Sequence, residues 1–210
     1  ALYNLVDAYF VGGLGTSQMG AISVAFPLGQ VIVGLGLLFG NGAASYISRL
    51  LGHGETETAD RVASTALYSN ISVGAVIIIC TILFLRPILR LLGATESILP
   101  YAEIYAGIYV VSSIFNIFNV TMNNIVTSEG AAKTTMCALL TGAVLNMVLD
   151  PVFIYVLHLG VAGAAIATAI SQIVSTAVYL CYVFRKKSVF SFSIKKCCFS
   201  SEIMSEILKI

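Results

Sequence analysis

The stretch Leu145-Asn-Met-Val-Leu-Asp-Pro-Val-Phe-Ile-Tyr155 places an amide and a carboxylate inside a long apolar segment. Asn146 and Asp150 are four residues apart, so on a helix both side chains lie on the same face. Pro151 has no backbone N–H to donate to the carbonyl of Met147, which therefore stays free. Because a carboxylate within a membrane helix is costly, this stretch is the first candidate for a functional site.

The composition is that of a membrane protein. Of 210 residues, 58% are hydrophobic and 10% are charged, whereas soluble domains carry roughly 25% charged residues. A formal net charge of +1 provides no basic surface for nucleic acid, so we exclude that class of partner. The five cysteines show no C-x-x-C spacing, and we expect neither a disulfide framework nor a zinc site.

Apolar segments predict six membrane-spanning helices, since a helix needs about 20 residues to cross the hydrocarbon layer. The first, residues 1–11, contains Asp7, and we expect it to be truncated because the sequence begins inside it without Met. The other five are predicted at residues 17–50, 61–85, 100–128, 134–157 and 161–184. The predicted fold class is an all-α integral membrane protein, a six-transmembrane-helix bundle over residues 1–184.

The charges of the loops predict how the bundle is oriented. Of the eleven Lys and Arg residues, only Arg86 and Arg90 fall in loops of one side, and the other nine lie on the opposite side or in the tail. Basic residues concentrate on the cytoplasmic side of membrane proteins. We therefore expect a plasma-membrane protein in which residues 185–210 form a cytoplasmic linker. Glu129 and Lys133, four residues apart at a membrane boundary, are expected to form a local ion pair.

The predicted fourth span carries polar and phenolic residues at intervals of three or four positions, which places them within about 80° of one another on a helix. A helix that lines a water-filled cavity has a reason to collect such groups on one side, whereas a helix that faces lipid has none. The alternative is that these groups hold neighbouring helices together. They are Tyr101, Tyr105, Tyr109, Ser112, Asn116, Asn119, Asn123 and Thr127.

The predicted second span has a similar face of polar and small residues, with a bend expected at Pro27. Gln30 lies on that face, whereas the glycines of Gly34-Leu-Gly36-Leu-Leu-Phe-Gly40 are best explained by close helix packing. The residues that we expect to line a substrate cavity are Gln30, Tyr105, Tyr109, Asn116, Asn119 and Asn123.

Asp7 and Asp150 are the acidic residues that lie inside predicted spans and away from their ends. Ionisable residues within a membrane are candidates for function, although a structural carboxylate is the alternative. Asn146, on the face of Asp150, and Thr168, early in the sixth span, can supply further oxygen ligands.

Four motifs, in this order along the chain, resemble the multidrug and toxic compound extrusion (MATE) family of transporters. The resemblance covers nearly all of residues 1–184. The motifs are Tyr3-Asn4-Leu-Val-Asp7, Ala25-Phe26-Pro27, Ser128-Glu129-Gly130-x-x-Lys133 and Asn146-x-x-x-Asp150-Pro151.

Members of that family have two six-helix lobes, and this chain is similar to the amino-terminal lobe, so residues 185–210 would lead towards a missing carboxy-terminal lobe. The resemblance implies a secondary active antiporter rather than an enzyme, with no cofactor. It exports organic cations or amphiphilic drugs in exchange for protons or sodium ions. The resemblance also implies that the coupling cation, H⁺ or Na⁺, binds at Asp7, Asn146, Asp150 and Thr168.

Three other functions compete with this one. A lipid-linked oligosaccharide flippase of related fold would more often carry basic groups in its cavity, and none falls within these predicted spans. An intramembrane aspartyl protease needs a Gly-x-Gly-Asp context, which neither Asp7 nor Asp150 has. A membrane fragment that does not transport is the third alternative.

Overall fold

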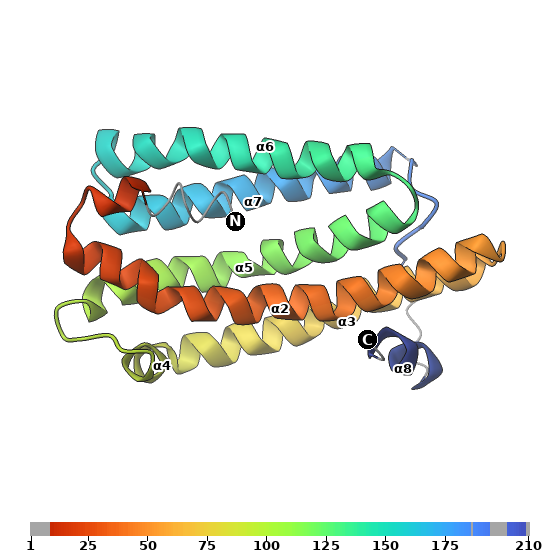
Figure 1. The fold of residues 1–210 in the computed structure, drawn as a ribbon, viewed down its shortest axis with the longest axis horizontal. Helices are drawn as coiled ribbons and strands as arrows, with labels where there is room; N and C mark the ends of the chain where they lie inside the picture. Colours follow the sequence, from red (N-terminus) through yellow and green to blue (C-terminus); the bar gives the residue numbers. More distant parts are fainter. Residues whose placement is uncertain (1–8, 186, 194–200, 209–210) are drawn as a thin grey trace. The chain divides into compact units, whose positions relative to one another are not determined.

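The computed structural model describes residues 9–185, 187–193 and 201–208. From α2 to α7 the helices within these residues follow one another with short connections (Figure 1), and residues 185–200 separate α7 from α8. They are α2 (Thr16–Gly52), α3 (Thr56–Leu83), α4 (Leu85–Leu91), α5 (Leu99–Ser128), α6 (Ala132–Pro151) with its π-helical continuation η1 (Val152–Val156), α7 (Gly160–Phe184) and α8 (Ser201–Leu208).

Five helices in the described part of the chain are long and apolar enough to cross a membrane. They are α2, α3, α5, α6 with η1, and α7, and they confirm the five complete spans predicted from the sequence. Of the predicted first span, residues 9–11 are described and are helical. The remainder, Asp7 included, lies outside the described residues.

Two predicted boundaries were wrong. Residues 56–60, expected in a loop, form the first turns of α3, where the ion pair between Arg61 and Glu57 at 2.9 Å supports a helix through its i, i+4 spacing. After α3 the chain begins a second helix, α4, with Pro87 in its first turn. A proline is tolerated there because the missing N–H has no partner within the helix.

Glycines end three of the helices in the same way. At the end of α5, Gly130 has a φ of 87°. Its N–H donates to the carbonyl of Thr127 at 3.0 Å, and the N–H of Ala131 donates to the carbonyl of Val126 at 3.1 Å. This pair of bonds is the Schellman motif, which satisfies carbonyls that the helix end leaves free. The turns at Gly54 and Gly93 repeat it, so sharp reversals separate α2 from α3 and α4 from α5.

The chain divides into two compact units, and the long helices contribute separate parts to each. Unit 1 comprises residues 1–31, 76–115 and 140–174, and unit 2 comprises residues 32–75, 116–139 and 175–210. Each unit has its own hydrophobic core. The core of unit 1 is rich in alanine and includes Ala21, Ala25, Leu89, Leu99, Ala102, Ile154, Ala164 and Ala165.

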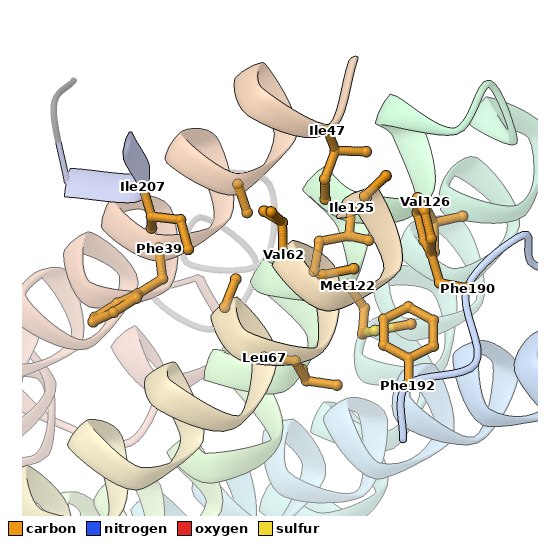
Figure 2. Close-up of a cluster of buried hydrophobic side chains, with 14 of the residues drawn as sticks. Phe39, Ile47, Val62, Leu67, Met122, Ile125, Val126, Phe190, Phe192 and Ile207 are labelled. Carbon is orange, nitrogen blue, oxygen red and sulfur yellow. The ribbon is translucent and has the colours of Figure 1, made fainter. Parts of the chain in front are cut away.

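The core of unit 2 joins side chains from α2, α3, α5, α8 and the segment after α7 (Figure 2). Glycines of α2 allow α5 to come close to it. A Cβ added at Gly36 would lie 2.9 Å from Cβ of Val120, and one at Gly40 would lie 2.7 Å from Nδ2 of Asn124. The close-packing interpretation is confirmed for Gly36 and Gly40, whereas nothing lies within 4 Å of a Cβ added at Gly34.

Residues 188–192, which we name the docked segment, fold onto unit 2. Phe190 and Phe192 are buried in its core (Figure 2). Asp60, at the start of α3, accepts the backbone N–H of Ser191 at 2.9 Å and its hydroxyl at 2.7 Å. Carboxylates usually accept strong hydrogen bonds of this kind, so the start of the predicted linker is anchored rather than free.

Glu129, after α5, anchors the other end of the docked segment. Its carboxylate accepts the hydroxyl of Ser188 and the backbone N–H of Val189, both at 2.9 Å. The predicted local ion pair with Lys133 is therefore wrong. The carboxylate binds backbone and hydroxyl donors from a distant part of the sequence instead of the ammonium group one turn away.

Candidate functional site

Three of the four predicted cation ligands come together in unit 1. Asn146 and Asp150 are fully buried, and Asn146 Nδ2 donates to Asp150 Oδ1 at 3.2 Å. The same nitrogen donates to Thr168 Oγ1, on α7, at 3.4 Å. One amide thus links a carboxylate one turn away on its own helix to a hydroxyl on the next helix. Asp7 lies outside the described residues.

The local sequence explains why α7 approaches α6 closely here. The chain reverses at His158 and Gly160, which both have positive φ, and α7 then begins with small residues. A Cβ added at Gly163 would lie 2.8 Å from the backbone of Phe153. Small residues of this kind let membrane helices pack backbone to backbone, which brings Thr168 within reach of Asn146.

The orientation of the Asn146 amide leaves one oxygen available. An ionised carboxylate only accepts hydrogen bonds, so the NH₂ group of Asn146 faces Asp150 and its carbonyl oxygen faces elsewhere. That oxygen, Oδ1, is buried and has no hydrogen-bond partner among the described residues. A buried acceptor without a partner costs free energy unless a donor or a cation reaches it.

The basic side chains of unit 1 are engaged with other acids. Arg86 pairs with Glu103, and Arg90 lies 3.0 Å from Glu96. The hydrogen bond to Glu103 raises the pKa of Arg86 above its ordinary value, so this guanidinium stays charged at any physiological pH. Both arginines lie on α4, and each is paired with one acid, so these two pairs carry no net charge.

Two of the predicted cavity residues lie in unit 1 on α5. The rings of Tyr105 and Tyr109 stack with centroids 5.9 Å apart, and Tyr105 is buried. Tyr109 packs against α2, since a Cβ added at Gly29 would lie 2.8 Å from its hydroxyl. The next residue on α2, Gln30, is exposed.

The other predicted cavity residues lie in unit 2, and two of them bond to α7. Asn119 Oδ1 accepts the hydroxyl of Thr176 at 2.9 Å, and Asn123 Nδ2 donates to the hydroxyl of Tyr179 at 3.3 Å. These bonds join α5 to α7, as expected if the polar groups of α5 hold neighbouring helices together. Asn116 is half-buried, and its Oδ1 has no hydrogen-bond partner among the described residues. A role in substrate binding stays a prediction for all three.

Sequence reasoning missed Tyr155, which lies in η1. Its hydroxyl donates to the carbonyl of Phe10 at 2.5 Å, at the end of the predicted first span. A phenol in a membrane segment is common and gives no signal by itself.

Apolar membrane-spanning helices around a buried carboxylate, amide and hydroxyl are the features of a polytopic membrane transporter. The chain belongs to the MatE family, whose model matches residues 1–152. The multidrug export protein MepA of Staphylococcus saprophyticus is 35% identical over 210 residues, which is 100% of this chain and 47% of that protein.

Solved structures agree with this assignment. A MATE transporter crystallised in the bent conformation has a TM-score of 0.94 and 33% identity, with 100% of this chain and 47% of that one covered. An inward-facing multidrug resistance MATE transporter of the MOP superfamily has a TM-score of 0.94 and 34% identity, with 100% and 48% covered. The predicted fold class, one lobe of a two-lobed transporter, is confirmed.

The chain spans about half the length of the curated relatives that it matches, 47% in the case above. Membership of a transporter family sets the intramembrane protease aside. The flippase alternative is not favoured either, because the relatives are multidrug export proteins.

Proposed function

We propose that this chain is the amino-terminal lobe of a cation-coupled antiporter that exports organic cations or amphiphilic drugs across the plasma membrane, with residues 185–210 in the cytoplasm. In this proposal Asp7, Asn146, Asp150 and Thr168 bind the coupling cation. The observation that carries it is the fully buried pair of Asn146 and Asp150 beside Thr168, between apolar helices. Relatives that are multidrug export proteins support the substrate class.

The physical basis is the cost of a buried carboxylate. An Asp at the centre of a membrane helix costs on the order of 3 kcal/mol on insertion scales, and a bound cation offsets that cost. A proton binds the carboxylate directly. Sodium prefers oxygen ligands as other hard cations do, and Asp150 and Thr168 Oγ1, which the Asn146 amide joins, offer such oxygens, with the unpartnered Asn146 Oδ1 as a third.

Cation binding drives export if it disfavours bound substrate. The residues proposed to bind substrate are Gln30, Tyr105 and Tyr109 in unit 1 and Asn116, Asn119 and Asn123 in unit 2, and their aromatic and amide groups suit flat cations and amphiphiles. A cation that enters the carboxylate site removes the negative charge that attracts a cationic drug, so the two compete. Alternating access between two repeats then converts the competition into exchange.

The test is Asp150→Asn in the complete two-lobed transporter. The substitution removes a costly charge, so insertion and folding should persist, while export driven by a proton or sodium gradient should be lost. Glu96→Gln is the matched control, because Glu96 is an exposed acid whose side chain pairs with Arg90. Efflux is measured in vesicles with a pH gradient in the absence of sodium, and again with a sodium gradient at equal pH. Wild-type efflux by Asp150→Asn at matched expression would refute the proposal.

A further inference from the structure

Gly163, in the first turn of α7, lies against the backbone of the helix that carries Asp150. A Cβ added at Gly163 would lie 2.8 Å from both the carbonyl carbon and the carbonyl oxygen of Phe153, and 3.1 Å from the backbone nitrogen of Ile154. Backbone atoms cannot turn aside as the end of a flexible side chain can. The contact therefore sets a minimum distance between the two helices, and glycine makes that distance short.

The same two helices carry the oxygens of the proposed cation site. α6, which η1 continues, contributes Asp150 and Asn146, and α7 contributes Thr168. Phe153 follows Asp150 by three residues, and Gly163 precedes Thr168 by five, which is about 7.5 Å along a helix. The backbone contact at Gly163 and the hydrogen bond from Asn146 to Thr168 thus join the same pair of helices within two turns of α7.

The spacing of these helices affects a metal cation and a proton differently. A proton binds the carboxylate of Asp150 alone and needs no oxygen from α7. Sodium, as a hard cation, needs several oxygens at once, and Asn146 and Thr168 supply oxygens from both helices beside the carboxylate. The distance between the helices is therefore a property to which sodium is sensitive and a proton is not.

A methyl group added at Gly163 widens this spacing. For the contact to lengthen from 2.8 Å to the 3.4 Å at which ordinary contacts begin, the two backbones must separate by about 0.6 Å. A helix bends only gently over two turns, so most of this displacement reaches Thr168. It exceeds the tolerance of about 0.2 Å on the distance from a metal ion to its ligand. The carboxylate of Asp150, by contrast, keeps both of its oxygens.

We infer that Gly163 is a positioning residue that holds α7 close enough to α6 for the site to bind sodium, and that a proton can bind Asp150 without it. The residues present fit such an ion. Asn146 is fully buried, and its Oδ1 has no hydrogen-bond partner among the described residues, so a hard cation would satisfy this oxygen. The inference rests on the proposed function, and it assigns the choice between the two coupling cations to one backbone contact.

The experiment is Gly163→Ala in the complete transporter, purified in detergent, with equilibrium binding of radioactive sodium as the first measurement. The sodium dissociation constant should rise about tenfold, the low end of the losses seen when the support of a metal ligand is altered. Gly107→Ala on α5 of the same unit is the matched control, because the atom nearest to its added Cβ, Leu85 Cδ2, lies 3.9 Å away. The control should bind sodium as the wild type does.

A second measurement separates the two cations. Drug export driven by a pH gradient in the absence of sodium should stay within about twofold of the wild type in Gly163→Ala, because a proton needs no oxygen from α7. An equal loss of sodium binding and proton-driven export would indicate a general structural defect and would overturn the inference. Wild-type sodium binding in Gly163→Ala would overturn it as well.

A second variant tests whether Gly163 acts through Thr168. Thr168→Val removes the oxygen of α7 while the contact at Gly163 stays, and it should weaken sodium binding to a similar extent. Gly163→Ala/Thr168→Val should then bind sodium no more weakly than Thr168→Val alone, and additive losses would contradict the inference. If Gly163→Ala does not fold, Thr168→Val decides: it must lose sodium binding and keep proton-driven export, and any other result counts against the role of Gly163.

Failure of the inference can be told from failure of the proposed function. If Asp150→Asn loses gradient-driven export while Gly163→Ala keeps wild-type sodium binding, only the positioning role is wrong. The same holds if Asp150→Asn loses export and the wild type binds no sodium. If Asp150→Asn retains gradient-driven export, the cation site itself is wrong, and the positioning role falls with it.

Discussion

Asn146 donates from Nδ2 to Oδ1 of Asp150 across one turn of α6, with both side chains fully buried. The donor has a second N–H, which it gives to Thr168 Oγ1 of α7. The amide therefore fixes the carboxylate and the hydroxyl relative to each other. Its own carbonyl oxygen faces away from Asp150 and has no hydrogen-bond partner among the described residues.

Asn146→Ala should weaken cation binding in the complete transporter. It removes a donor to a buried carboxylate and a ligand oxygen, and hydrogen bonds to charged groups contribute about 1.5–3 kcal/mol, which corresponds to about a tenfold to hundredfold loss of affinity. Thr168→Val should cost less, because its bond to Asn146 is longer, at 3.4 Å. The measurement is the cation dependence of export. Thr141→Val, at an exposed position of α6, is the control, and equal losses in all three variants would contradict this account.

Asp60→Ala should release the docked segment. Asp60 is 5% exposed and accepts two hydrogen bonds from Ser191, which have no substitute once the carboxylate is gone. Cleavage by trypsin after Lys187, an exposed residue next to the docked segment, should become about tenfold faster, as opening becomes easier. Glu55→Ala, an exposed acid in the preceding turn, should leave the cleavage rate unchanged. Equal cleavage rates in the wild type and Asp60→Ala would show that the buried rings of Phe190 and Phe192 hold the segment alone.

Gly36→Ala should destabilise unit 2, whereas Gly34→Ala should not. The added methyl group at residue 36 would lie 2.9 Å from both Cβ and Cγ1 of Val120, and Cβ cannot move without the backbone of α5, whereas nothing lies within 4 Å at residue 34. Overpacking of this kind costs about 1–3 kcal/mol. Gly34→Ala should be neutral or stabilise by about 0.5–1 kcal/mol through helix propensity. Unfolding in detergent, followed by circular dichroism, measures the difference. The packing of α2 against α5 would be refuted by equal stabilities.

Residues 1–210 expressed alone should not export drugs. Alternating access arises from the motion of one repeat against another, and the chain spans 47% of a two-lobed relative. The measurement is efflux of a fluorescent organic cation from cells that lack their own exporters. Residues 1–210 are compared with the empty vector and with the complete transporter. Efflux above the empty vector would show that this lobe forms a pathway by itself, for example as a dimer of identical copies.

The sequence by itself determined the class of protein, the five complete spans and the pairing of Asn146 with Asp150. These features depend on composition, on apolar length and on a spacing of four residues within one helix, and a helix converts such spacings directly into geometry. The MATE resemblance was also legible in short ordered motifs. Close packing at the glycines of α2 was also predicted from the sequence, because glycines four residues apart form a smooth strip on one face of a helix, whereas the partner helix, α5, was not.

Only the tertiary structure decided which distant groups meet. Asp60 and Glu129 bind the docked segment, Asn119 and Asn123 bond to α7, and Tyr155 reaches Phe10. Periodicity shows which face of a helix is polar, but the partner on that face depends on how the helices pack, and that is set by side chains from several segments at once. Tyr155 lies in the π-helical turn that follows Pro151, beside which the backbone of Phe153 packs closely against Gly163 of α7, and such a contact depends on two segments at once.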